Sequence, residues 1–158
     1  MPQTPATPEG AAPATAGERV LFRWPVRVYW EDTDAGGIVF YANYLKFFER
    51  ARTEWLRALG VQQQALREQD GAIFVVAETA LRYHAPARLD DRLDVTVALA
   101  EHGSASMRLR QQAWCGQRLL AEGDIRIGCV DHGTLRPRRI PSAIHRALQA
   151  PTPSSPAP

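Results

Sequence analysis

The feature that most limits how this chain can fold is one helix-forming segment with a wide apolar face. Between about residues 43 and 59, apolar side chains recur at spacings of three and four, the period of an α-helix. These side chains are Tyr44, Phe47, Phe48, Ala51, Trp55, Leu56 and Leu59. Gly60 follows, and glycine is favoured just beyond a helix end. Because such a wide apolar face has to be shielded from water, we expect the rest of the chain largely to enclose this helix.

The pattern then changes to the alternation typical of β-strands. After Gly71 a long strand is predicted with one shared face, formed by Ile73, Val75, Ala77, Thr79, Leu81 and Tyr83. Alternation also predicts strands around Leu93–Leu99, around Met107–Leu109 and over about 119–130, where Ile125, Ile127 and Cys129 share a face.

Two further segments complete the prediction. Leu21–Trp30 is strand-prone, and a short helix is expected at 62–69. A strand, a helix and then four meandering strands predict the α+β class, in which an antiparallel sheet of about five strands wraps around one long central helix.

Composition sets the limits of the domain. The chain has 158 residues, enough for one ordinary domain, and eight of its twelve prolines lie in residues 1–18 or 150–158. Because those ends contain no Leu, Ile, Val or Phe, we expect disordered tails at 1–18 and 150–158 around a single domain at 19–149. The first tail does not have the apolar stretch of a secretory signal, so a cytoplasmic location is expected.

Charge and cysteine content exclude several classes of function. The 19 basic and 17 acidic residues give a net charge of +2, which disfavours nucleic acid as a partner. No apolar run approaches the roughly 20 residues of a membrane-spanning helix, so stable membrane insertion is not expected. Cys115 and Cys129 are too few for a disulfide scaffold and have no metal-ligand spacing, so we interpret both as small core residues.

The loop EDTDAGG at residues 31–37, between the first strand and the helix, is the most unusual segment. One interpretation is a simple turn, because Asp and Gly favour turns and the side-chain oxygens can cap backbone N–H groups. A calcium loop is excluded because Gly36 and Asn43 occupy positions where side-chain ligands are required. The third interpretation is catalytic. A carboxylate would face the positive end of the helix, where a thioester or ester carbonyl could be polarised, and Gly36 and Gly37 would let substrate approach the backbone.

The same residues carry a resemblance to a known family. The run RVYWEDTDAGGIVFYANY at 27–44, followed by FERAR at 48–52, resembles the hydroxybenzoyl-CoA thioesterase family of hotdog-fold enzymes. Within that family, LFRWPVRVY at 21–29 and YHAPARLDD at 83–91 are most similar to the Tol–Pal-associated acyl-CoA thioesterases of bacteria. The similarity covers most of 20–141.

The resemblance implies a hotdog fold and hydrolysis of acyl-CoA thioesters, with Asp34 as the central carboxylate. Asp34 would attack the thioester carbonyl or activate a water molecule, and the backbone N–H near Tyr41 would hold the carbonyl oxygen. An aspartate is already ionised at neutral pH, so the sequence leaves nucleophile and general base as alternatives.

Two positions depart from the Tol–Pal-type pattern. Many such relatives have Tyr where this chain has Trp30 and His where it has Tyr41. An indole cannot accept a hydrogen bond, and a phenol is a poor proton acceptor near neutral pH. We therefore expect Tyr41 to contribute its N–H and Trp30 to line the acyl pocket.

Other residues are weaker candidates. Glu49 could be the carboxylate instead, although a surface pair between Glu49 and Arg52 explains it as well. Arg88, Arg138 and Arg139 could hold coenzyme A phosphates, or could belong to a solvated basic face. The four histidines have no metal-type spacing.

These observations predict a cytoplasmic acyl-CoA thioesterase for short-chain or aromatic acyl groups that needs no metal or cofactor. Catalysis is assigned to Asp34 and Tyr41, and substrate binding to Gly37, Trp30, Arg88 and Arg138. A homodimer or homotetramer is expected, and an acyl carrier protein is a candidate partner. The alternatives are a non-enzymatic acyl-CoA or acyl-carrier-protein binding module, a cytoplasmic accessory of the Tol–Pal system, and hydration of an enoyl thioester, which usually requires an Asp–His pair.

Overall fold

One antiparallel sheet and one long helix form the body of the protein. The computed structural model describes residues 20–149, so the tails expected at 1–18 and 150–158 lie outside the described residues. The five strands lie in the order β1-β3-β4-β5-β2, with β1 and β2 at the two edges. Their bounds are β1 Val20–Arg27, β2 Ala72–Tyr83, β3 Arg92–His102, β4 Ser106–Cys115 and β5 Arg118–Asp131.

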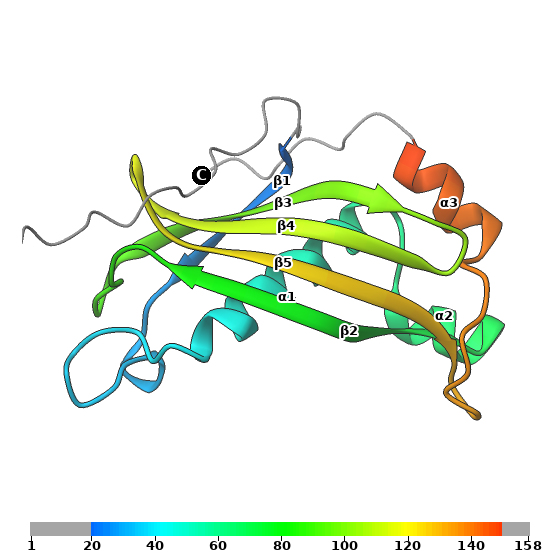
Figure 1. Ribbon diagram of the computed structural model, residues 1–158, viewed down its shortest axis with the longest axis horizontal. Helices are drawn as coiled ribbons and strands as arrows, with labels where there is room; N and C mark the ends of the chain where they lie inside the picture. The colour runs from blue at the N-terminus through cyan, green and yellow to red at the C-terminus, as the bar shows by residue number, and fades with distance from the viewer. Residues whose placement is uncertain (1–19, 150–158) are drawn as a thin grey trace, which may run out of the picture.

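The predicted long helix is α1, Asn43–Ala58, and it lies across one face of the sheet. Two shorter helices, α2 (Gln63–Asp70) and α3 (Ser142–Gln149), lie at one end of the sheet, and the loop that leads into α1 lies at the other end (Figure 1). The helix expected at 62–69 is therefore confirmed as α2, whereas the sequence interpretation did not include α3.

The core forms where α1 meets the sheet. The buried apolar residues of α1 include six of the seven predicted ones, and Leu59 packs partly buried against the same cluster. The predicted inward faces of β3, β4 and β5 are also buried, as Leu93, Val95, Val97, Met107, Leu109, Ile125, Ile127 and Cys129. The sheet covers the apolar side of α1, as predicted, while Leu45, Lys46, Glu49 and Arg50 on the outer side of the helix stay exposed.

The prediction of one shared face for β2 is wrong, because a β-bulge interrupts the strand. Its register against β5 shifts between Val76 and Glu78. Phe74 is therefore opposite Cys129 while Leu81 is opposite Gly123, and both Phe74 and Leu81 pack against the core. An extra residue in one strand reverses the alternation beyond it, so Ile73 and Val75 face away from the side that Leu81 occupies.

The first strand is shorter than predicted. β1 ends at Arg27, and a 3-10 turn, η1 (Trp30–Asp32), replaces its expected end. The N–H of Val28 donates to the carbonyl of Asp91, and the N–H of Asp32 donates to the carbonyl of Tyr29. The chain therefore leaves the sheet just before the acidic loop.

Candidate active site

Asp34 lies in a tight reversal between η1 and α1. Thr33 and Val39 form an isolated antiparallel bridge, which closes the loop. Inside it, the N–H of Asp34 donates to the carbonyl of Ile38 at 2.9 Å, and the N–H of Gly37 donates to the carbonyl of Asp34 at 3.0 Å. Gly37 has φ of +74°, a conformation that strains other residues. Gly37 thus allows a reversal of this shape.

The carboxylate of Asp34 is both part of this turn and open to solvent. Its Oδ1 accepts a hydrogen bond from the N–H of Gly36 at 2.8 Å, which is the contact that the turn interpretation predicts. The residue is exposed, and within residues 20–149 its second oxygen, Oδ2, has no hydrogen-bond partner. One oxygen therefore fixes the side chain while the other is available to a ligand.

Asp32, two residues earlier, is buried and joins the loop to the helix. Only 2% of this residue is exposed. Its carboxylate accepts from the Nδ2 of Asn43, the first residue of α1, and from the N–H of Tyr29, both at 2.8 Å. Its carbonyl also accepts from the N–H of Phe40 at 2.9 Å. These bonds set how the acidic loop lies relative to the start of α1.

The start of α1 has no side-chain cap. Ala42 occupies the capping position, and the first turn contains no acidic residue. Among the described residues, the N–H groups of Tyr41 and Ala42 have no hydrogen-bond acceptor. Free N–H groups and the positive end of the helix dipole favour an anionic oxygen. This helix end can therefore hold a carbonyl oxygen that develops negative charge.

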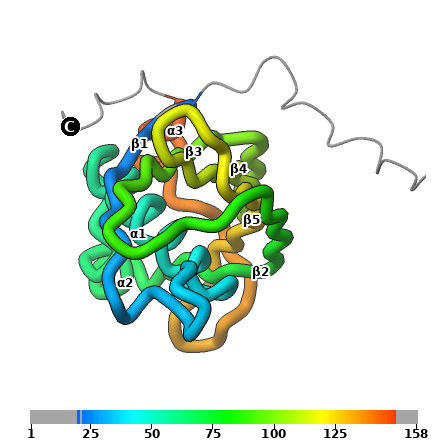
Figure 2. The backbone as a smooth tube through the Cα atoms, turned by 90° about the vertical axis from the view of Figure 1, so that its left-hand side faces the viewer, coloured from blue at the N-terminus to red at the C-terminus, as the bar shows by residue number. Residues whose placement is uncertain are grey.

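A second segment, residues 84–91, lies against the acidic loop (Figure 2). The N–H of Val39 donates to the carbonyl of Ala87, and Ile38 forms an isolated bridge with Arg88. The N–H of Ala87 donates in turn to the hydroxyl of Tyr44 on α1, at 3.3 Å. The loop is therefore held by both α1 and the segment that links β2 to β3.

The structure brings most of the predicted site residues to one end of the molecule, but not all of them. Asp34, Gly37, Tyr41 and Trp30 belong to the loop and its flanks, and Trp30 is 80% exposed. Arg88 adjoins the loop through its backbone bridge to Ile38.

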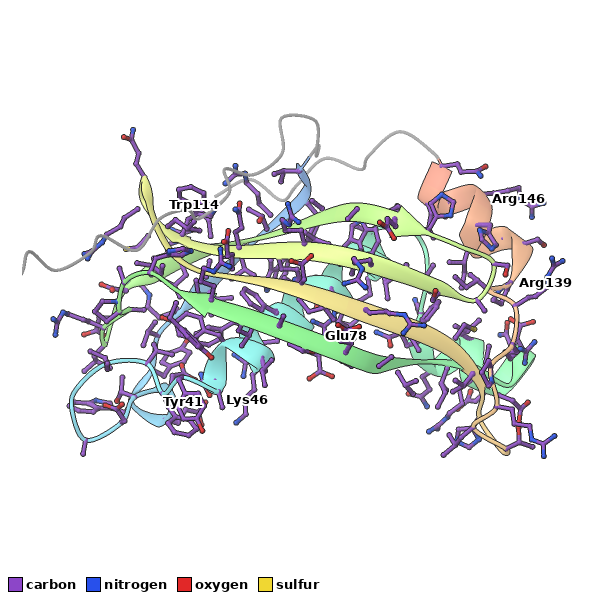
Figure 3. All side chains as sticks on the ribbon, in the orientation of Figure 1. Tyr41, Lys46, Glu78, Trp114, Arg139 and Arg146 are labelled. Carbon is purple, nitrogen blue, oxygen red and sulfur yellow. The ribbon has the colours of Figure 1, made fainter. Side chains whose placement is uncertain are left out.

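Arg138 and Arg139 lie elsewhere. Figure 3 shows Tyr41 and Arg139 at opposite ends of the sheet. Arg138 is the neighbour of Arg139, and its guanidinium donates to the carbonyl of Asp70 at the end of α2. Within one subunit, Arg138 is therefore not brought to Asp34.

Glu49, the rival carboxylate, interacts with the charge of Arg52, but among residues 20–149 the two side chains form no ion pair within 4 Å. Arg52 instead donates to the Oε1 of Gln111 at 2.9 Å, and Gln111 is fully buried. Glu49 and Arg52 line a pocket between α1, α2 and the sheet, and no residue of the acidic loop lines that pocket. Burial lowers the pKa of Arg52. This polar group therefore links α1 to β4 away from Asp34.

Three residues of the site carried no functional assignment from the sequence: Asp32, Asn43 and Tyr83. Tyr83 donates its hydroxyl to the carbonyl of Tyr41 at 2.8 Å. Asp32 lies in the same acidic loop as Asp34, and the resemblance that singled out Asp34 assigned no role to Asp32. Tyr83 is distant in sequence, and only the folded chain brings it to residue 41.

The site offers no cluster of metal ligands. Within residues 20–149, no group of three or more His, Cys, Asp or Glu side chains could hold a metal ion. His84, the histidine of the 84–91 segment, has its Nε2 at 3.4 Å from the Oε1 of Glu122. None of the helices described here combines the length and apolar character that crossing a membrane requires.

The chain is similar in sequence and in fold to known thioesterases. Residues 28–148 match the model of the Thioesterase-like superfamily. The chain is 46% identical over 125 residues to the acyl-CoA thioester hydrolase YbgC of Escherichia coli O6:H1, covering 78% of this chain and 92% of that protein. It is 43% identical to the acyl-CoA thioesterase YbgC of Haemophilus influenzae, covering 80% and 93%. The crystal structure of a probable thioesterase from Bartonella henselae is similar, with a TM-score of 0.72, 31% identity and coverage of 75% and 98%.

The chain therefore belongs to the Thioesterase-like superfamily, and the predicted hotdog fold is confirmed. Within that superfamily it is an acyl-CoA thioesterase, a hydrolase of the kind that its YbgC relatives represent.

Proposed function

We propose that this enzyme hydrolyses the thioester of a short-chain or aromatic acyl-CoA through the carboxylate of Asp34. In the general-base form, Asp34 takes a proton from water as the water oxygen bonds to the carbonyl carbon. The carbon–sulfur bond then breaks, and the sulfur of coenzyme A accepts the proton. In the nucleophilic form, Asp34 bonds to the carbonyl carbon, the carbon–sulfur bond breaks and coenzyme A leaves as its thiolate. Water then hydrolyses the resulting anhydride, which releases the carboxylic acid, frees Asp34 and supplies the proton that the thiolate takes up.

The observation that carries this proposal is the pairing of an exposed carboxylate with an uncapped helix end. Asp34 is exposed, and among residues 20–149 neither its Oδ2 nor the N–H groups of Tyr41 and Ala42 at the start of α1 have a hydrogen-bond partner. Backbone donors aimed at a developing oxyanion are a large source of rate acceleration in acyl transfer. In this proposal Tyr41 acts through its N–H, since its side chain is 64% exposed and its hydroxyl has no hydrogen bond within residues 20–149.

Three further residues are proposed to contact the substrate because they lie in or beside the acidic loop. Gly37 has open space where a Cβ would stand, which supports close approach of the substrate to the backbone. Trp30 offers an exposed indole beside the loop for the acyl group. Arg88 adjoins the loop and is exposed, which suits it to the phosphates of coenzyme A.

A homo-oligomer is part of the proposal. β2 is an edge strand, and its residues from Val76 to Ala80 are exposed, as is the outer side of α1. A second subunit on this edge would cover apolar surface that one subunit leaves open. Arg138 could contribute to coenzyme A binding only at the site of another subunit.

The cytoplasmic location of the protein and its partners other than acyl-CoA stay predictions. Cys115 and Cys129 are both free, which supports a reducing compartment such as the cytoplasm. An acyl carrier protein and an accessory role beside the Tol–Pal system also stay predictions. Binding of acyl-CoA without release of thiol would favour a binding or accessory role over catalysis.

The test is thiol release from a panel of acetyl-, butyryl-, hexanoyl-, benzoyl- and hydroxybenzoyl-CoA. Wild type is compared with Asp34→Asn, which keeps an oxygen for the bond from Gly36 but removes the charge. Turnover should fall by at least about 10²–10⁴-fold. Glu49→Gln is the matched control and should retain the wild-type rate. Equal rates for wild type and Asp34→Asn would reject the assignment.

A further inference from the structure

Tyr83 connects the edge strand β2 to the start of α1. It is the last residue of β2, and its hydroxyl donates to the carbonyl of Tyr41 at 2.8 Å. Its ring meets the ring of Tyr44, in the first turn of α1, edge to face with centroids 5.7 Å apart. Tyr44 is 2% exposed, so it gives Tyr83 a fixed surface to pack against. The hydroxyl is therefore held at the backbone carbonyl of Tyr41, two residues before α1 begins.

This contact acts on the groups that would bind the substrate oxygen. The carbonyl of Tyr41 and the N–H of Ala42 belong to one peptide group, so a hydrogen bond to the carbonyl polarises that N–H and makes it a stronger donor. The same bond fixes the backbone of residue 41, whose own N–H lies one peptide group earlier. Burial raises the pKa of the Tyr83 hydroxyl, so the hydroxyl stays protonated and able to donate at neutral pH.

We infer that Tyr83 is a positioning residue, which orients and polarises the backbone N–H groups of residues 41 and 42 toward the thioester carbonyl. The inference rests on the proposed function, in which those groups hold the carbonyl oxygen. Tyr83 itself does not exchange a proton with the substrate. Tyr83 is expected to stabilise mainly the transition state, because the negative charge on the carbonyl oxygen is largest there. It should affect substrate binding much less.

The test is Tyr83→Phe in the full chain, which removes the hydroxyl and keeps the ring. Tyr29→Phe is the matched control, because it removes an exposed phenol hydroxyl from the same end of the molecule. For each variant, kcat, KM and the melting temperature are measured. Tyr83→Phe should lower kcat about three- to tenfold and leave KM within about twofold, with a melting temperature close to that of the control.

A spectroscopic measurement separates positioning from a structural role. An acyl-CoA analogue with a methylene in place of the thioester sulfur keeps the carbonyl and is not hydrolysed. With a ¹³C-labelled carbonyl, its infrared stretch reports how strongly the bound oxygen is polarised. In wild type and Tyr29→Phe the band should lie below its position in water. In Tyr83→Phe the band should move back toward the position in water.

The outcomes are distinct. An unchanged kcat for Tyr83→Phe, or a lower kcat with the carbonyl band unmoved, would overturn the inference while wild type and Asp34→Asn still supported the proposed function. If wild type released no thiol, or if Asp34→Asn were as active as wild type, the proposed function would fail and the inference would fail with it.

Discussion

Asp32 and Asp34 are two residues apart, yet the fold gives them opposite surroundings. Asp32 is buried and accepts two hydrogen bonds through its carboxylate, whereas Asp34 is exposed and uses one oxygen within its own turn. The carboxylate of Asp32 therefore holds the loop to α1, whereas that of Asp34 faces solvent. The sequence interpretation assigned Asp34 through the family resemblance, but it gave no indication that Asp32 is buried and joins the loop to α1.

This difference predicts different effects on stability. Asp32→Ala leaves the N–H of Tyr29 and the Nδ2 of Asn43 without their acceptor, so the free energy of unfolding should fall by about 2–4 kcal/mol. Asp34→Ala loses one exposed turn contact and should cost less than about 1 kcal/mol. Urea unfolding of both variants measures the difference. Equal losses would contradict the role given to Asp32.

At the scale of elements, side chains of β2 and α1 pack so closely against β5 that one position on β5 has no room for a methyl group. A Cβ at Gly123 would lie 2.7 Å from the Cδ2 of Leu81 and 3.1 Å from the Cε2 of Phe48. Gly123→Ala should therefore lower the free energy of unfolding by about 1–3 kcal/mol. Gly128→Ala, on the same strand, meets no atom within 4 Å and is the control. Thermal or urea unfolding that ranked the two variants equally would refute this packing.

A buried polar contact also joins α1 to β4. Gln111 accepts from Arg52 and donates its Nε2 to the carbonyl of Phe48 at 3.0 Å. Gln111→Leu should destabilise the protein by about 2–4 kcal/mol, because it leaves the guanidinium of Arg52 without its acceptor. Adding Arg52→Met should restore at least about 1 kcal/mol of that loss. Additive losses in this double-mutant cycle would show that the two side chains do not interact.

Helices and strands could be predicted where apolar residues repeat with a helical or a strand period. The helix period gave α1 almost to the residue, and alternation gave the buried faces of β3 to β5. The bulge near Val76 was not predictable, because it follows from how β2 pairs with β5 and has no sequence pattern of its own. α3 was missed although its sequence carries a helical signal, since Ile144 and Leu148 are four residues apart and both pack against the core.

Across residues 20–149, the middle of the edge strand β2 and the outer side of α1 are exposed. Val76, on the edge strand β2, is 52% exposed, and the helix residue Leu45 is 42% exposed. If a second subunit covers this surface, the mass in solution is a multiple of the 17.6 kDa chain. Val76→Lys should then shift sedimentation equilibrium toward the single chain. Val20→Lys places the same charge on the opposite edge strand and should leave the mass unchanged. A wild-type mass of one chain would contradict the proposed oligomer.

Only the folded molecule shows how the site is assembled. The sequence predicted that Asp34 and the helix start act together, because both lie in one short segment. It could not predict that Tyr83 reaches residue 41, or that Arg138 lies at the far end of the sheet, because both facts depend on contacts between distant parts of the chain. Residue spacing alone carries no information on such contacts.

The central claim is that the charge on Asp34 acts in the chemical step, and single-turnover thiol release tests it most directly. Enzyme in excess over acyl-CoA isolates this step from product release, and substrate affinity is measured on the same samples. The account predicts that Asp34→Asn binds substrate about as well as wild type but releases thiol at least about 100-fold more slowly. A variant that released thiol at the wild-type rate would contradict it.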